Sequence, residues 1–274
     1  MSLRRVMFQP LHRFVRWVTG RMLPPLAYPV ITGPLRGARF VLRAAAGQGG
    51  GASVYVNRME PAKTQALLGV LAPGQVVFDV GANIGYYTVL ASRRVGPAGR
   101  VIAFEPFPRN IAYLYRHVAV NRLENVSIVP AACSDRSGLS RFVPGVDCAE
   151  GRLIADASPA ANVEYVSTVT IDEIVRQSGF APDVLKIDVE GAEERVLAGA
   201  AETLGSAQPI LLLGVHSDAL KKACTALLDA HGYAEPVVCE EVEGDTELLF
   251  MPARQQDGPA RARPRPARPG TLCE

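Results

Sequence analysis

Between residues 76 and 231 the chain alternates short, continuously apolar runs with segments of helical character. A continuously apolar strand has to be buried on both faces, and intervening helices bury it by covering both faces of a parallel sheet. This alternation limits the fold more than any other feature, and it predicts the α/β class. The predicted strands are Val76–Val80, Val101–Phe104, Val126–Val129, Val184–Ile187 and Ile210–Val215, and the predicted helices are Gly85–Arg94, Pro108–Arg122, Ala192–Leu204 and Ala219–His231.

Two further segments near the C-terminus are typical of strands. Glu235–Cys239 and Thr246–Met251 flank a turn that contains Gly244, so we expect a closing, hairpin-like pair. Residues 138–170 break the alternation. We interpret them as an insertion with a strand near Glu164–Val169.

The first 60 residues differ from the rest in composition and pattern. Two short strands are expected at Ala38–Leu42 and Ser53–Val56, followed by a helix from Pro61 to Leu71. Before them, a basic helix is predicted over residues 3–22, either lying on a membrane surface or a partner, or packed on the body with solvated arginines. Its apolar face consists of Leu11, Phe14, Val15, Val18 and Met22.

We therefore divide the 274 residues into three parts. Residues 60–253 form the predicted α/β domain, which includes the insertion at 138–170. Residues 1–59 form a basic region that packs on this domain or caps it. Residues 254–274 are rich in proline and arginine, and we expect them to be disordered.

The charge distribution separates classes of ligand. The formal net charge is +2, yet nine arginines and no acidic residue precede Glu60, so the excess of acids falls on the predicted α/β domain. A duplex-binding domain would carry a basic face on its folded body, and no nucleic-acid partner is expected. An acidic body favours a cationic ligand.

Cysteine use and hydropathy indicate the compartment. The five cysteines are widely spaced and none forms a C-x-x-C pair, which argues against a zinc knuckle or a disulfide framework. The N-terminus lacks the uninterrupted apolar stretch of a signal peptide. The segment Met22–Leu35 is short and holds four prolines, so it is not expected to span a membrane. These features predict a cytoplasmic protein.

The turn after Val76–Val80 is the most informative motif. Gly81 and Gly85 lead from this strand into a helix, and glycines let a backbone approach a ligand closely. Glu105 ends the next strand, 20 residues after Gly85, where a carboxylate accepts hydrogen bonds from ribose hydroxyls. Together these features predict a ligand that contains an adenosine.

Asp79 distinguishes between two such ligands. A dinucleotide site uses G-x-G-x-x-G to hold a pyrophosphate, and this turn lacks that spacing. The carboxylate of Asp79 would repel a pyrophosphate and attract an ammonium or sulfonium, by roughly 4 kcal/mol at ~4 Å before desolvation. S-adenosylmethionine (SAM) carries both cations and no phosphate, so it is the predicted cofactor. Ala132, among small residues after the third strand, would leave room for adenine or allow close packing.

A second group of polar residues follows the next two strands. Asp188 and Glu190 come after Val184–Ile187, and His216 comes after Ile210–Val215. The carboxyl ends of parallel strands share one edge of a sheet, so we expect these side chains beside Asp79 and Glu105. The following acids, Glu193 and Glu194, are equally consistent with a favourable helix start.

Three strings carry a family resemblance: D-V-G-A-N-I-G at 79–85, F-E-P at 104–106 and K-I-D-V-E-G-A-E at 186–193. Together they resemble the FkbM-type family of SAM-dependent methyltransferases, from about Glu60 to about Met251. The resemblance implies a class I, Rossmann-like fold: a seven-stranded, mostly parallel sheet with helices on both faces and one antiparallel strand near the C-terminus. It also implies methyl transfer to a hydroxyl of a sugar, glycolipid or polyketide-like small molecule.

The resemblance and the motif together define the predicted cofactor site. By position, the family pattern assigns SAM contacts to Asp79, Gly81, Asn83, Gly85 and Glu105. The full predicted cofactor site comprises Asp79, Gly81, Ala82, Asn83, Gly85, Tyr86, Glu105, Pro106, Ala132 and Asp188.

The predicted catalytic residues are His216, Asp188 and Glu190. An alcohol needs a base, and the ordinary pKa of histidine suits His216 to that task, with Asp188 orienting it or acting itself. No metal is assigned, although a divalent ion on Asp188 and Glu190 is an alternative way to acidify a hydroxyl.

One residue departs from the family pattern. The family usually has an acid two residues before the histidine, and this chain has Gly214, so any role of that acid must be lost or moved. A protein that binds the cofactor or its product without turnover is therefore an alternative. A nicotinamide-dependent oxidoreductase is another, which the glycine spacing disfavours.

Overall fold

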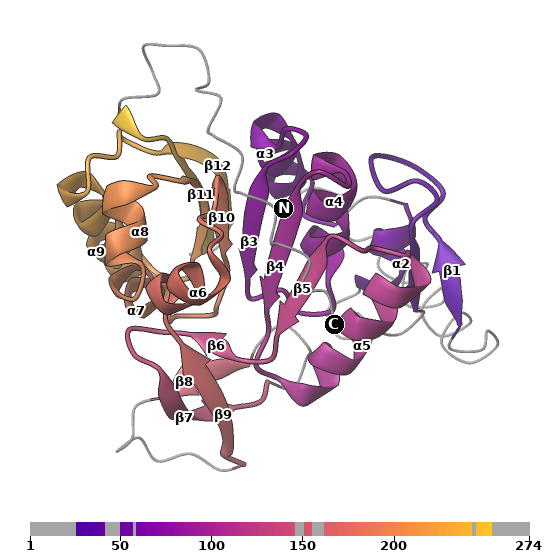
Figure 1. Ribbon diagram of the computed structural model, residues 1–274, viewed down its shortest axis with the longest axis horizontal. Coiled ribbons are helices and arrows are strands. Elements are labelled where there is room, and N and C mark those ends of the chain that lie inside the picture. The colour runs from indigo at the N-terminus through magenta and orange to yellow at the C-terminus, as the bar shows by residue number, and fades with distance from the viewer. Residues whose placement is uncertain are drawn as a thin grey trace, which may run out of the picture.

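The computed structural model describes residues 26–41, 50–56, 59–145, 151–154, 162–242 and 245–253. Its main sheet (Figure 1) contains β3 (Val76–Val80), β4 (Arg100–Phe104), β5 (Val126–Val129), β10 (Val184–Ile187), β11 (Ile210–Val215), β12 (Val237–Val242) and β13 (Asp245–Phe250), in the order β12-β13-β11-β10-β3-β4-β5. The pairs from β11 to β5 are parallel, and β13 is antiparallel to both β11 and β12. This confirms the predicted α/β fold with one antiparallel strand near the C-terminus.

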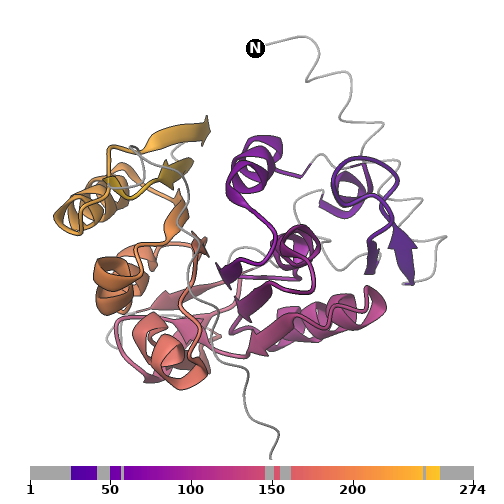
Figure 2. The same cartoon turned by 45° about the horizontal axis from the view of Figure 1, so that its top comes forward.

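Helices lie on both faces of the main sheet, as Figures 1 and 2 show. Alternate residues of one strand point to opposite faces of the sheet. Val77 packs in the hydrophobic cluster that includes the N-terminal elements, and Phe78 packs in the hydrophobic cluster that includes the later helices. The first layer comprises α3 (Pro61–Val70), α4 (Tyr86–Val95) and α5 (Pro108–Val120), and the second comprises α6 (Ile171–Ser178), α7 (Glu193–Ala198), α8 (Ala201–Ser206) and α9 (Asp218–Ala230).

The helix predicted over Ala192–Leu204 is divided into α7 and α8. Gly199 lies at the break, and a Cβ there would be 2.0 Å from the carbonyl oxygen of Ser134. A neighbouring backbone therefore passes where a continuous helix would carry a side chain. The prediction of one continuous helix was wrong, because Gly199 and Ala200 both depart from helical backbone angles.

A second, four-stranded sheet accounts for the break in the alternation. It contains β6 (Ala132–Cys133), β7 (Gly138–Val143), β8 (Arg152–Ile154) and β9 (Glu164–Val169), in the order β6-β9-β7-β8. The strand predicted near Glu164–Val169 is confirmed as β9, whereas β6, β7, β8 and the helix α6 were not predicted.

The N-terminal elements pack on the face of the sheet that carries α3 and α4. β1 (Ala27–Pro29) and β2 (Arg39–Val41) form an antiparallel pair, and α2 covers Gly50–Tyr55. The predicted strand at Ser53–Val56 was wrong: Val54 is buried in the core, and the Tyr55 hydroxyl donates a hydrogen bond to the Phe40 carbonyl. The predicted helix over 3–22 and the tail at 254–274 lie outside the described residues, and the boundaries of the three parts stay predictions.

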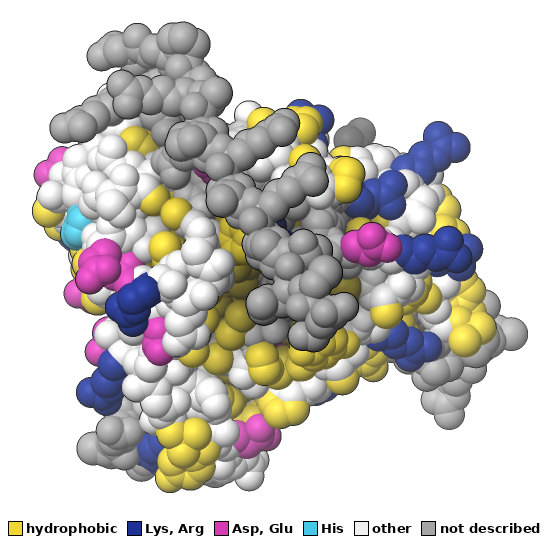
Figure 3. All heavy atoms as spheres, in the orientation of Figure 1, with side chains coloured by type: hydrophobic (Ala, Val, Ile, Leu, Met, Phe, Trp, Pro, Cys, Tyr) yellow, Lys and Arg dark blue, Asp and Glu magenta, His cyan; other side chains and the backbone are white. Residues whose placement is uncertain are grey.

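Arginines gather around these N-terminal elements. In Figure 3 most of the visible Lys and Arg side chains lie on the side of β1, α2 and α5. Arg93 donates to the Arg36 carbonyl at 3.1 Å, and Arg39 donates to the Ala27 carbonyl at 3.4 Å. Within the described residues, no helix combines the length and the apolar character that crossing a bilayer requires.

His117 on α5 joins the N-terminal strands to the body. It is fully buried, and its Nε2 accepts the Val41 N–H at 2.9 Å. Its Nδ1 therefore carries the proton and donates to the Ile84 carbonyl at 2.6 Å, in the turn before α4. Burial lowers the pKa of His117 to about 4, although the bond to Ile84 opposes that shift.

This depressed pKa predicts an acid-sensitive fold. The folded state favours neutral His117, so this residue contributes to the free energy of unfolding above pH 6.5. That contribution, about 3 kcal/mol in total, is lost as the pH falls toward 4. We expect urea titrations at several pH values to show this loss, and to show a smaller one in His117→Gln. Equal pH dependence in both proteins would contradict the assignment.

Candidate active site

Four adjacent strands of the main sheet end at one edge, which we call the rim. The strands are β4, β3, β10 and β11, and their carboxyl ends carry Glu105, the glycine turn, Asp188 and His216 respectively. The structure therefore brings together residues that are more than 100 positions apart in the chain. This is the edge at which open α/β sheets bind ligands.

The glycine turn after β3 is shaped by backbone contacts. Gly81 has a φ of 76°, and a Cβ there would be 1.8 Å from the carbonyl oxygen of Asp188. Gly85 has a φ of 93°, and a Cβ there would be 2.6 Å from Leu114 Cδ1. Both positions therefore need glycine for reasons internal to the fold, and the turn holds β3 against the end of β10.

Asp79 is paired inside the protein. It is 1% exposed, and its Oδ1 lies 2.9 Å from Nζ of Lys186, the residue opposite it on β10. The Thr88 hydroxyl donates to Oδ2 at 2.6 Å, and Lys186 also donates to the Gly81 carbonyl at 3.2 Å. The sequence argument used the Asp79 carboxylate to attract a cationic ligand, whereas in the structure Lys186 compensates that charge. The carboxylate holds the turn in place. The predicted contact of Asp79 with the cofactor stays a prediction.

Glu105 is also largely buried, and it organises the next part of the rim. Its Oε2 accepts the Asn83 N–H at 2.7 Å, and its Oε1 accepts the Phe107 N–H at 3.0 Å. Burial raises the pKa of Glu105, and these bonds oppose that shift. Asn83 has a left-handed φ of 51°, and its buried Oδ1 has no hydrogen-bond partner among the described residues. The site thus presents oxygen acceptors beside the glycine turn.

Other predicted cofactor residues have side chains in the core. Ala82 packs with Leu114, and the ring of Tyr86 lies 6.1 Å from that of Phe40. Ala132 is 7% exposed within the small cluster of the second sheet. Pro106 is half-buried next to Glu105. The side chains of Ala82 and Tyr86 are thus committed to the core. The cofactor contacts predicted for Ala82, Tyr86 and Ala132 stay predictions.

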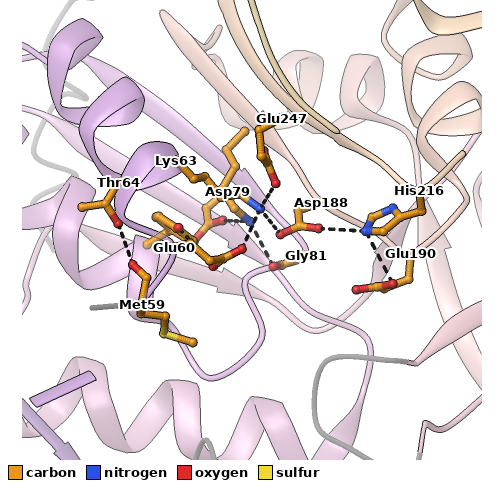
Figure 4. A network of polar contacts seen from close by, with 12 residues as sticks. Met59, Glu60, Lys63, Thr64, Asp79, Gly81, Asp188, Glu190, His216 and Glu247 are labelled. Atoms are coloured by element: carbon orange, nitrogen blue, oxygen red, sulfur yellow. Dashed lines mark hydrogen bonds and ion pairs between the residues drawn. The ribbon is translucent and has the colours of Figure 1, made fainter. Parts of the chain in front are cut away.

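A buried lysine that the sequence did not single out lies beside Asp188. Lys63 on α3 is 1% exposed, and its Nζ is 2.6 Å from Asp188 Oδ2, 2.5 Å from Glu247 Oε1 and 3.3 Å from Glu60 Oε1 (Figure 4). Burial lowers its pKa, but the three carboxylates outweigh burial and hold the pKa well above its ordinary value. Lys63 is therefore a fixed cation at the rim.

Lys63 also determines the protonation state of Asp188. Burial would raise the pKa of Asp188, but the charges of Lys63 and Lys186 outweigh burial and hold that pKa below its ordinary range. Asp188 is therefore ionised at neutral pH, and its lowered pKa makes it a weak base. This favours a positioning role over a role as base.

His216 lies between three carboxylates. Its Nδ1 is 3.1 Å from Glu193 Oε1, and its Nε2 is 3.5 Å from Glu190 Oε2 and 3.7 Å from Asp188 Oδ1. Glu193 is fully buried, so it fixes the orientation of the ring. The reading of Glu193 as a first-turn acid therefore missed this contact.

The carboxylates change the protonation expected for His216. Burial lowers its pKa, but the bond to Glu193 and the charges of Glu190 and Asp188 raise it to about 9. The base role of His216 was predicted from the ordinary pKa of histidine, and this environment moves the pKa above that value. Burial and the neighbouring acids raise the pKa of Glu190 to about 7, although the charge of His216 opposes them, so Glu190 titrates near neutrality.

Two groups of side chains have the geometry of a divalent-cation site. Asp188, Glu190 and His216 offer ligand atoms within 4.8 Å of one another, which adds His216 to the pair considered from sequence. Glu60, Asp188 and Glu247 do the same, but the ammonium of Lys63 already contacts all three.

Comparison with known proteins shows which family the chain resembles. The model of the methyltransferase FkbM domain matches residues 79–235, which include every rim residue except Lys63, Glu60 and Glu247. The chain is 28% identical over 219 residues to the 31-O-demethyl-FK506 methyltransferase FkbM of Streptomyces tacrolimicus, covering 69% of this chain and 84% of the relative.

Two other similar proteins cover less of their own length. The hexuronic acid methyltransferase AglP of Haloferax volcanii is 30% identical over 159 residues, covering 56% of this chain and 61% of the relative. A crystal structure of methyltransferase FkbM from Methylobacillus flagellatus KT has 17% identity and a TM-score of 0.49, covering 76% of this chain and 56% of that chain.

The lysine cluster gives a test of what holds the rim together. Lys63→Met would leave Asp188 and Glu247 without their shared cation, so we expect a loss of about 3 kcal/mol in the free energy of unfolding. Lys221→Met is the matched control, because Lys221 pairs with exposed Glu241 at 3.4 Å and should cost less than about 1 kcal/mol. Equal losses in urea titrations would show that the buried cluster adds no stability.

Proposed function

The chain belongs to the FkbM methyltransferase family, and from that membership we propose that it uses SAM to methylate a hydroxyl of a sugar, glycolipid or polyketide-like small molecule. The observation that carries the proposal is the chemistry of the rim, where the glycine turn, Glu105 and the ionised Asp188 meet. The similarity to a 31-O-demethyl-FK506 methyltransferase and a hexuronic acid methyltransferase supports an oxygen-bearing acceptor.

The residues beside the glycine turn fit SAM. Asn83 Oδ1 is a buried acceptor without a partner in the described part of the chain, and the carboxylate of Glu105 lies against the same turn. Acceptors in these positions suit a ligand that brings hydroxyl and ammonium donors and no phosphate. Glu105 and Asn83 would hold such a ligand, while Asp79 and Lys186 keep the turn in shape. When bound, SAM supplies an electrophilic methyl group on its sulfonium.

The proton of the acceptor hydroxyl needs a base at the other end of the rim. Glu190 has a pKa of about 7, so a large fraction of its carboxylate is free to accept a proton at neutral pH. His216 lies 3.5 Å from that carboxylate and, as an imidazolium held by Glu193, favours its ionised form. We therefore assign the role of base to Glu190 and the role of holding its charge to His216.

The proposed cofactor predicts that the chain binds SAM. Isothermal titration calorimetry should show SAM binding to the full chain and no comparable binding of NAD. Glu105→Gln should lower the affinity for SAM by about 10-fold or more, because a charged hydrogen-bond acceptor is replaced by a neutral one. Glu124→Gln, an exposed residue, is the matched control. Binding of NAD in preference to SAM would refute the proposed cofactor.

The proposed reaction predicts turnover, measured as transfer of radiolabel from SAM to hexuronic acids, their glycosides and polyketide alcohols. The carboxylate form of Glu190 increases as the pH rises through about 7, so kcat/KM should rise between pH 6 and 8. Glu190→Gln should lower kcat by ~10²–10⁴-fold and remove this rise. Exposed Glu194 provides the control Glu194→Gln, which should behave as wild type.

These experiments separate the alternatives. SAM binding with no transfer to any acceptor in the panel would favour a binding protein over an enzyme. Transfer that is unaffected by Glu190→Gln would move the base to another residue.

A further inference from the structure

We propose that Glu247 is a positioning residue of the active site. Its carboxylate, which comes from β13, fills the space over Gly214 on the neighbouring strand β11. The catalytic part of this inference rests on the proposed methyl transfer, and the structural part does not. Glu247 lies on β13, outside the region that the family model matches.

The strand register brings the two positions together. β11 and β13 are antiparallel, and Gly214 is directly opposite Glu247. Directly opposed residues of an antiparallel pair point to the same face of a sheet. Here that face carries α3 and Lys63, as Figure 4 shows for Glu247.

The space over Gly214 is filled by carboxylates from its neighbours. A Cβ at Gly214 would be 3.1 Å from Glu247 Oε1 and 3.3 Å from Asp188 Oδ1. The glycine therefore leaves room for the glutamate of the next strand, and a side chain at 214 would crowd the carboxylates of Glu247 and Asp188. A carboxylate is present at this place, and it is attached to β13 instead of β11.

Glu247 completes a clamp on Asp188. The ammonium of Lys63 has three protons, and it contacts Asp188, Glu247 and Glu60 at 2.6, 2.5 and 3.3 Å. Because Glu247 and Glu60 hold Lys63 from other directions, Asp188 Oδ2 is fixed and Oδ1 is left on the side of His216. Glu247 thus acts on the rim through Lys63.

The burial of Glu247 argues against a passive surface acid. Its side chain is 17% exposed, and its buried Oε2 has no hydrogen-bond partner among the described residues. Burial raises its pKa, and Lys63 opposes that shift only in part. Burying a carboxylate with one unpartnered oxygen costs free energy of folding. This cost points to a role for the charge of Glu247 beside Lys63.

An exchange of the two residues tests the structural part. We would compare Gly214→Glu, Glu247→Gly and the double variant that carries both changes in the full chain. Each single change should lower the urea midpoint of unfolding. Gly214→Glu adds a second glutamate beside Glu247 near Lys63, and Glu247→Gly removes the carboxylate that pairs with Lys63. The double variant restores one carboxylate over the same face, so it should recover about half or more of the summed loss. Additive losses would overturn the inference.

Glu247→Gln tests the catalytic part without changing the shape of the side chain. In the radiolabel assay, with the acceptor that wild type methylates fastest, kcat should fall by about 10-fold or more while the SAM affinity from calorimetry stays within about two-fold. The exchange variant should regain part of that kcat. Glu241→Gln, on exposed residue Glu241 of β12, is the matched control.

The outcomes separate the two proposals. If Glu247→Gln turns over as wild type does, Glu247 is not a positioning residue. If the exchange restores stability but wild type methylates nothing in the panel, the cross-strand clamp stands and the proposed function fails.

Discussion

The ammonium of Lys186 holds the centre of the site. It reaches from β10 to Asp79 on the neighbouring strand and to the carbonyl of Gly81, at 2.9 and 3.2 Å. A buried charge is tolerated only with a close partner, so this pair fixes the ends of the two central strands relative to each other. The backbone contact between Gly81 and the Asp188 carbonyl depends on that alignment. The rest of the rim is built outward from these two strands.

Charge compensation, more than charge itself, distinguishes the roles of the acids. Asp79 is paired with Lys186 and Asp188 is paired with Lys63, so neither offers a free negative charge. Glu190 has His216 as its neighbour and keeps a pKa of about 7. Asp79 and Asp188 therefore hold the structure through their lysine partners, whereas Glu190 has a pKa near neutrality.

Local patterns predicted most of the main sheet because burial on two faces leaves a signal in the strand itself. β3, β5, β10 and β11 have the bounds expected from their apolar runs. The helix α6 was missed although Thr170 caps it and accepts the Glu173 N–H, a local signal that was available. The break at Gly199 was also missed, although glycine within a helical pattern is a local signal for one. The helix α2 was read as a strand, and its Val54 packs in the core.

The sequence by itself determined the fold class, the glycine turn and the strand ends that carry Glu105, Asp188 and His216, since each depends on residues adjacent in the chain. Only the tertiary structure decided the protonation of those groups and the identity of their partners. Lys63 meets Asp188 across 125 positions, and Glu247 meets Lys63 from the last strand of the sheet. Ion pairing and burial act through space, and the order of residues along the chain contains no record of which charges the folded sheet brings within 3 Å.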